Sequence, residues 1–162
     1  MQKTILTLPE IKLVGITART NNVSEMNPKT AKIAPTIQKY LQNAMYEKIP
    51  NRKEGKTYCV YTEYESDFNG DYTYFIGAAV ESFGELPEGY VEHIIPAQDY
   101  AKFTNDPGPM PLVCINMWQK IWQMSPQGLG GKRNYLSDFE LYDERAANPL
   151  SVVLDIHIGI GK

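Results

Sequence analysis

The second half of this chain repeats the order of turns and strands found in the first half. In each half a tyrosine and, two residues later, a glutamate precede a turn, and an Ile-Gly pair follows it. The matching segments are Tyr61-Thr62-Glu63 and Tyr142-Asp143-Glu144, Asn69-Gly70-Asp71 and Ala147-Asn148-Pro149, and Phe75-Ile76-Gly77 and His157-Ile158-Gly159. The first hairpin spans 16 positions and the second spans 17. A duplicated unit places a cleft on its own pseudo-symmetry axis, and we expect the function to reside there.

Helical and extended patterns complete each repeat. Apolar residues at helical spacing predict helices at about residues 35–47 and 111–124, each between an extended segment and a hairpin. The order strand, helix, strand, strand therefore occurs in repeat one, about residues 10–80, and in repeat two, about residues 90–160. We predict an α+β fold with a duplicated β-α-β-β repeat, forming a single domain over residues 1–162. One antiparallel sheet would carry two helices on one face and a central ligand cleft.

Charge and composition exclude several classes of function. The formal net charge is -3, which argues against non-specific nucleic-acid binding, because that binding needs a basic surface. The sequence has no signal peptide and no run of about 18 apolar residues, so we expect a cytoplasmic protein without membrane contact. Cys59, Cys114, His93 and His157 lack the spacing of metal ligands, so we expect no metal and no cofactor.

The alternation of side chains along the strands predicts which residues share a face of the sheet. Val152, Leu154, Ile156 and Ile158 form an apolar row that should face the helices. We assign Phe139 and Leu141 to the same face. The opposite, uncovered face would then present Cys59, Tyr61, Phe75, Glu140, Tyr142 and His157.

A carboxylate among aromatic rings suits an organic cation. Ring faces attract positive charge, and Glu140 would neutralise that charge with little competition from water. The simpler interpretation is that Glu140 is a solvated strand residue and that the tyrosines form cross-strand pairs. Trp118 and Trp122 lie four residues apart on one helix face, where they would pack helix on sheet or line the cleft. Both alternatives stay open at the level of sequence.

An ordered set of short segments resembles the GyrI-like family, the small-molecule-binding domains also called bacterial transcription-activator effector-binding domains. The resemblance runs from about Glu10 to Ile160. It rests on Tyr58-Cys59-Val60-Tyr61, Asn69-Gly70-Asp71-Tyr72, Ile76-Gly77, the segment 95–103, Pro107-Gly108-Pro109, Ile121-Trp122 and Asp138-Phe139-Glu140-Leu141-Tyr142. It implies two repeats around a central pocket, in which Glu140 meets cationic or polar aromatic ligands. Many members follow a DNA-binding domain, which this sequence lacks, so we expect no direct contact with nucleic acid.

Three functions are compatible with this resemblance. The first is a stand-alone protein that senses or sequesters amphipathic aromatic, often cationic, small molecules. The second is a hydrolase of reactive cyclopropane-bearing toxins, in which Glu140 would position or deprotonate a water while tyrosines and tryptophans hold the electrophile. The third is a protein-interaction role with gyrase or a regulator as partner. Binding is the leading hypothesis, with Glu140, Tyr142, Tyr61, Phe75, Cys59, His157, Trp118 and Trp122 as candidate ligand contacts and Glu140 as the one candidate catalytic residue.

Overall fold

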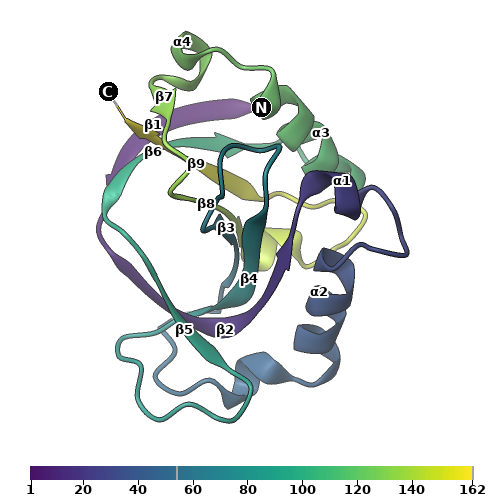
Figure 1. Cartoon of the computed structure of the whole chain (residues 1–162), viewed down its shortest axis with the longest axis vertical. Helices are drawn as coiled ribbons and strands as arrows, with labels where there is room; N and C mark the ends of the chain where they lie inside the picture. Colours follow the sequence, from purple (N-terminus) through teal and green to yellow (C-terminus); the bar gives the residue numbers. More distant parts are fainter. Residues whose placement is uncertain (54, 162) are drawn as a thin grey trace.

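The chain folds into one large sheet flanked by helices (Figure 1). A computed structural model describes residues 1–53 and 55–161; Glu54 and Lys162 lie outside the described residues. In chain order the elements are β1 (Gln2–Leu8), β2 (Ile11–Thr20), α1 (Asn22–Glu25), α2 (Ile33–Gln42), a 3₁₀ helix (Met45–Lys48), β3 (Thr57–Thr62), β4 (Tyr72–Ala79), β5 (Val91–Ile95), β6 (Gln98–Thr104), α3 (Leu112–Trp122), α4 (Pro126–Leu129), β7 (Lys132–Arg133), β8 (Ser137–Tyr142), a second 3₁₀ helix (Glu144–Ala146) and β9 (Asp155–Gly161).

The strand order confirms the predicted duplication. Neighbouring strands are antiparallel and follow the order β1-β6-β9-β8-β3-β4-β2-β5, with β7 paired to β9. Repeat one supplies β3-β4-β2 and repeat two supplies β8-β9-β6, so the β3–β8 pair lies at the centre between them. Three details differ from the sequence prediction, and the first is that the prediction contained no strand at the position of β1. The first long helix ends at Gln42, since Ala44 adopts a left-handed conformation with φ of 48°, and the last strand starts at Asp155.

The outermost strands are exchanged between the repeats. Strand β1 pairs with β6 of repeat two, and β5 pairs with β2 of repeat one. Only Pro9-Glu10 joins β1 to β2, and only Pro96-Ala97 joins β5 to β6, although the joined strands lie near opposite ends of the sheet. Such short connections require the sheet to curl, and Figure 1 shows the strands curving around a common centre.

Both long helices cover the same face of the sheet. A row of cross-strand neighbours runs through Ile16, Ile76, Cys59, Glu140 and Ile156, and cross-strand neighbours point to one face. Helix α2 packs on the repeat-one end of this row and α3 on the repeat-two end. The predicted α+β fold with two helices on one face is therefore confirmed.

The predicted face of β8 was wrong. Phe139 is paired with His157 and lies on the face away from the helices, and Leu141 packs there too. Glu140 therefore lies on the helix face with Ile156. Cys59, Tyr61 and Tyr142, which were also predicted on the uncovered face, lie on the helix face too. The helix-free face is also not uncovered, because the curled sheet closes on itself there. That second core contains Leu13, Val60, Phe75, Ile95, Tyr100 and Phe139.

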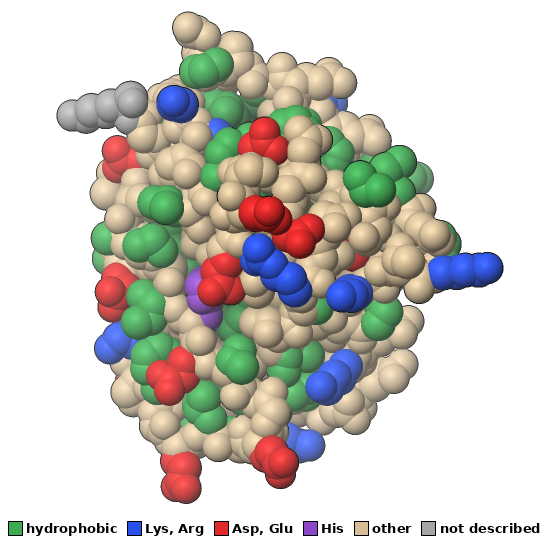
Figure 2. Space-filling view, viewed as in Figure 1, with side chains coloured by type: hydrophobic (Ala, Val, Ile, Leu, Met, Phe, Trp, Pro, Cys, Tyr) green, Lys and Arg blue, Asp and Glu red, His purple; other side chains and the backbone are tan. Residues whose placement is uncertain are grey.

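The visible surface has no large patch of one charge. On the face shown in Figure 2, acidic and basic side chains are interspersed with hydrophobic ones. Among the described helices, none has the length and apolar character needed to cross a membrane.

Candidate functional site

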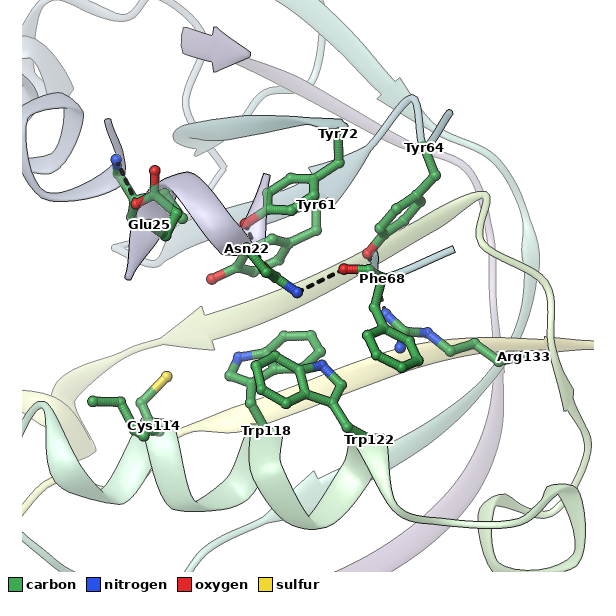
Figure 3. A pocket seen from close by; sticks show the side chains of 12 residues that line it. Asn22, Glu25, Tyr61, Tyr64, Phe68, Tyr72, Cys114, Trp118, Trp122 and Arg133 are labelled. Atoms are coloured by element: carbon green, nitrogen blue, oxygen red, sulfur yellow. Dashed lines mark hydrogen bonds between the residues drawn. The ribbon is translucent and has the colours of Figure 1, made fainter. Parts of the chain in front are cut away.

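A cavity of about 240 Å³ lies between the helices of the two repeats (Figure 3). Its walls come from α1 and the start of α2, from β3, β4 and the turn between them, from α3 and from β7. It thus lies over the central strands, close to the junction of the repeats. The lining residues are Asn22, Glu25, Ile33, Tyr61, Tyr64, Phe68, Tyr72, Cys114, Ile115, Trp118, Trp122 and Arg133.

Aromatic residues make up half of the residues that line this cavity. The Tyr61 ring meets the Trp118 ring edge to face at 5.0 Å between centroids and the Tyr72 ring at 5.6 Å. At the other end Phe68 stacks on Trp122 with centroids 6.1 Å apart and planes inclined by 14°. The ring faces and edges that remain open to the cavity form a surface suited to flat apolar groups and to cations.

The Glu140 carboxylate lies directly behind this wall. Its side chain is buried, with 4% of the residue exposed, and Oε2 accepts hydrogen bonds from the Tyr61 hydroxyl and the Trp118 indole N–H, both at 2.7 Å. Oε1 accepts from the Tyr142 hydroxyl at 2.6 Å. All three donors are neutral, so they satisfy the oxygens without cancelling the charge. Within residues 1–53 and 55–161, none of the ion pairs involves Glu140.

Burial and the carboxylate keep the neighbouring groups protonated. Burial first, and then the charge of Glu140, raises the pKa of the Tyr61 and Tyr142 hydroxyls well above their ordinary value. The same two causes raise the pKa of the Cys114 thiol, whose sulfur lies 3.7 Å from the Tyr142 hydroxyl oxygen. These groups act as neutral donors and apolar surface at neutral pH, and Cys114 is not a thiolate nucleophile.

Two further charged groups line the cavity. The Glu25 carboxylate accepts from the backbone amides of Lys32 at 2.8 Å and Ile33 at 3.1 Å, and so caps the start of α2. The Arg133 guanidinium pairs with the fully buried Asp138 at 2.8 Å. Arg133 is therefore neutralised by its own partner, whereas Glu140 has no cationic partner among the described residues.

The structure brings together most of the residues that the sequence singled out. Tyr61, Trp118 and Trp122 line the cavity, and Glu140 with Tyr142 forms the layer beneath. Cys59 lies beside Glu140 in the cross-strand register but does not line the cavity.

Phe75 and His157 lie elsewhere. Both are on the helix-free face, where Phe75 belongs to the second core and His157 stacks on Phe139 at 4.2 Å. The prediction that they share a face with Glu140 was wrong. His157 is the cross-strand neighbour of Phe139, and Phe75 is that of Val60, whereas Glu140 lies on the other face with Ile156.

Sequence reasoning missed the lining residues that come from loops and short elements. Glu25 and Asn22 belong to a polar segment, and Phe68 occurs in the β3–β4 turn. Phe68, an aromatic residue within a polar turn, was an available signal, because loops held by a rigid scaffold often carry binding residues. Among the described residues there is no group of three or more side chains suited to hold a metal ion.

Comparison with known proteins gives consistent matches over almost the whole chain. The family model described as integron-associated effector-binding protein matches residues 4–160. The putative transcriptional regulator YobU of Bacillus subtilis is 30% identical over 151 residues, which cover 93% of this chain and 92% of YobU. The transcriptional regulator BrlR of Pseudomonas aeruginosa is 35% identical over 96 residues, 57% of this chain but 34% of BrlR.

Solved structures agree with these matches. An integron cassette protein of Vibrio cholerae superposes with a TM-score of 0.77 at 30% identity, covering 98% of this chain and 95% of that chain. The structure of SAV2435 bound to tetraphenylphosphonium superposes with a TM-score of 0.76 at 17% identity, covering 99% and 94% of the two chains. The second likeness is one of fold.

Proposed function

Because this chain belongs to the family of integron-associated effector-binding proteins, which are GyrI-like, we propose that it binds amphipathic aromatic cations in order to sense or sequester them. Effector binding is the property for which this family is named. We infer the chemical class of the ligand and the role of Glu140 from the cavity and its aromatic wall.

The observation that carries this assignment is the uncompensated charge of Glu140. A buried carboxylate without a cationic partner is costly, because its attraction to water is lost and no opposite charge replaces it. Glu140, which is 4% exposed, lies next to a cavity with aromatic walls. A ligand cation over the Tyr61 and Trp118 rings would gain cation–π attraction and would supply the missing opposite charge. An anion would meet the same carboxylate and be repelled.

The size of the cavity limits the ligand. At about 240 Å³ it lies below the roughly 300–1,000 Å³ of drug-sized ligand sites. A ligand with one or two rings fits inside, whereas a larger one must displace the rim. Trp122 and Ile115 are exposed at the rim, and the Phe68 turn faces them, so these groups can move without disturbing the core.

The relatives support the same chemistry. SAV2435 was solved with tetraphenylphosphonium, a lipophilic aromatic cation, and it shares the fold of this chain. YobU and BrlR are described as regulators, in which binding of a small molecule would be the input signal.

The test is a calorimetric titration with tetraphenylphosphonium of the wild type, Glu140→Gln and Glu88→Gln. Glutamine keeps the shape of the side chain, and Glu88 is an exposed acid that serves as the matched control. We expect saturable binding that Glu140→Gln weakens by about 1–3 kcal/mol, the scale of a lost charged partner, and that Glu88→Gln leaves unchanged. Triphenylphosphine oxide, which is neutral, should bind more weakly and be indifferent to Glu140→Gln. Equal affinity of all three proteins for the cation would reject the role of Glu140.

The same variants test the two alternative functions. Consumption of a cyclopropane-bearing electrophile that Glu140→Gln abolishes, with affinity retained, would establish a hydrolase. Capture of purified gyrase, unaffected by Glu140→Gln, would establish the interaction role. Binding is preferred because all three hydrogen bonds to Glu140 come from protein groups that already hold the carboxylate in place.

A further inference from the structure

A second cavity adjoins the aromatic pocket. Its volume is about 220 Å³, and its walls include Ile121, Met124 and Leu129. Phe68, Trp122 and Arg133 line both cavities, so the stacked rings of Phe68 and Trp122 form the partition between them. Figure 3 shows these three side chains gathered at one end of the first cavity.

The two cavities differ in the sign of their charge. Lys132 and Arg133 are the charged residues that line the second cavity, and no acidic residue lines it in the described part of the chain. Asp138 neutralises Arg133 through its Nε and Nη2 atoms. Lys132 is exposed, and it takes part in none of the hydrogen bonds or ion pairs found among the described side chains. Lys132 is therefore the charged group of this cavity that has no ion-pair partner among the described residues.

We propose that the second cavity is a subsite for an anionic group on the same ligand, so that the preferred ligands are zwitterionic aromatic molecules. This inference rests on the proposed function. The cation lies over Tyr61 and Trp118 near Glu140, and a carboxylate reaches past Phe68 to Lys132. Charge complementarity at both ends orients the ligand, and the apolar walls of both cavities cover its aromatic body.

The Phe68 and Trp122 rings that separate the two cavities lie on a turn and at an exposed helix end, where they can rotate. Phe68 lies in the turn between β3 and β4, and its carbonyl oxygen accepts a hydrogen bond from Asn22 Nδ2 at 2.8 Å. Its ring contacts the partly exposed Trp122. Rotation of the two side chains joins the cavities into a space within the size range of drug-sized ligand sites.

A matched pair of dyes tests this subsite. Rhodamine 110 carries a free carboxylate and is a zwitterion, and rhodamine 123 is its methyl ester and a net cation. We expect the wild type to bind rhodamine 110 about threefold to fivefold more tightly, the scale of an exposed ion pair. Lys132→Gln should remove that preference and leave rhodamine 123 unchanged. Lys120→Gln, which removes an exposed lysine of α3 outside both cavities, is the control and should retain the preference.

The outcomes separate this inference from the proposed function. Equal binding of both dyes by the wild type, or equal weakening of both by Lys132→Gln, overturns the subsite while cation binding stands. Binding of tetraphenylphosphonium without either dye also overturns it. If neither the dyes nor tetraphenylphosphonium bind, the proposed function fails and the subsite fails with it.

Discussion

Tyr61 and Tyr142, which occupy equivalent positions of the two repeats, donate hydrogen bonds to opposite oxygens of the same carboxylate. Two residues before each tyrosine the repeats differ, since repeat one has Cys59 and repeat two has Glu140. These two residues are direct cross-strand neighbours in the β3–β8 pair. Two tyrosines in equivalent positions therefore hold a carboxylate that only one of the two repeats supplies.

Glu140→Gln should stabilise the ligand-free protein. The substitution removes a buried charge that lacks a cationic partner, and a tyrosine hydroxyl can rotate to accept from the new amide. We expect the free energy of unfolding in urea to rise by about 1 kcal/mol, with Glu88→Gln within about 0.5 kcal/mol of the wild type. A loss of stability in Glu140→Gln would show that the carboxylate is compensated in the folded state.

Asp138→Asn should have the opposite effect. Asp138 is fully buried, and it accepts hydrogen bonds from Arg133, from the Tyr64 hydroxyl at 2.7 Å and from the Gly159 amide at 2.8 Å. Its replacement leaves the guanidinium without its counter-charge, which costs about 3–5 kcal/mol. Urea unfolding of both carboxylate variants side by side measures the contrast. A matching change in Asp138→Asn and Glu140→Gln would contradict the distinction between a paired and an unpaired acid.

The two tryptophans should separate stability from binding. Trp118 is 8% exposed and Trp122 is 40% exposed. Trp118→Ala removes a core ring and a hydrogen bond to Glu140, so we expect a loss of about 3–5 kcal/mol in stability. Trp122→Ala should cost less than about 1 kcal/mol in stability but weaken cation binding by about 1 kcal/mol. Thermal unfolding and calorimetry on both variants give the comparison, and unchanged affinity in Trp122→Ala would remove this residue from the site.

His157 should make the protein less stable in mild acid. Burial lowers its pKa from the ordinary 6.5 to about 4, and its Nδ1 has no hydrogen-bond partner among the described residues. Between these values the unfolded chain takes up a proton that the folded chain does not. The free energy of unfolding therefore decreases as the pH falls from 6.5 to about 4, by up to about 1.4 kcal/mol per pH unit. Above pH 6.5 His157 makes no contribution to this pH dependence.

Urea unfolding at pH 7 and pH 5 measures this dependence. Between pH 7 and pH 5, His157→Gln should lose less stability than the wild type does. His93→Gln should reduce this pH dependence by a smaller amount, because His93 is only half-buried. The same slope in His157→Gln and the wild type would assign the acid sensitivity to other groups, such as His93, whose pKa is also lowered by burial.

The order of strand, helix, strand and strand within each repeat could be predicted from the sequence because it depends on local patterns, whereas β1 was missed. Turn residues and apolar spacing located both hairpins and both long helices. The face of β8 could not be predicted, because Phe139 and Leu141 on one side and Glu140 and Tyr142 on the other are all large side chains. Both faces of this strand are buried, one under helices and one inside the curled sheet. The alternation of side chains therefore does not reveal which set faces the helices.

The candidate site was predictable only where it lies on regular elements. Cys59, Tyr61, Glu140 and Tyr142 were placed together correctly because they follow the period of two along paired strands. Glu25, Phe68 and Arg133 reach the cavity from a short helix, a turn and a two-residue strand. Their positions depend on contacts between segments distant in sequence, such as the hydrogen bond from Asn22 to the Phe68 carbonyl.

The exchange of β1 and β5 means that neither half of this protein is self-sufficient. A chain with one repeat could complete such a sheet only by exchanging its first strand with an identical chain. The two copies would then place the same residue on each side beneath the cavity. Joining the copies in one polypeptide frees those positions to diverge, as Cys59 and Glu140 have done. Covalent linkage of the repeats thus allows the two halves of one interface to carry different residues, here a thiol on one side and a carboxylate on the other.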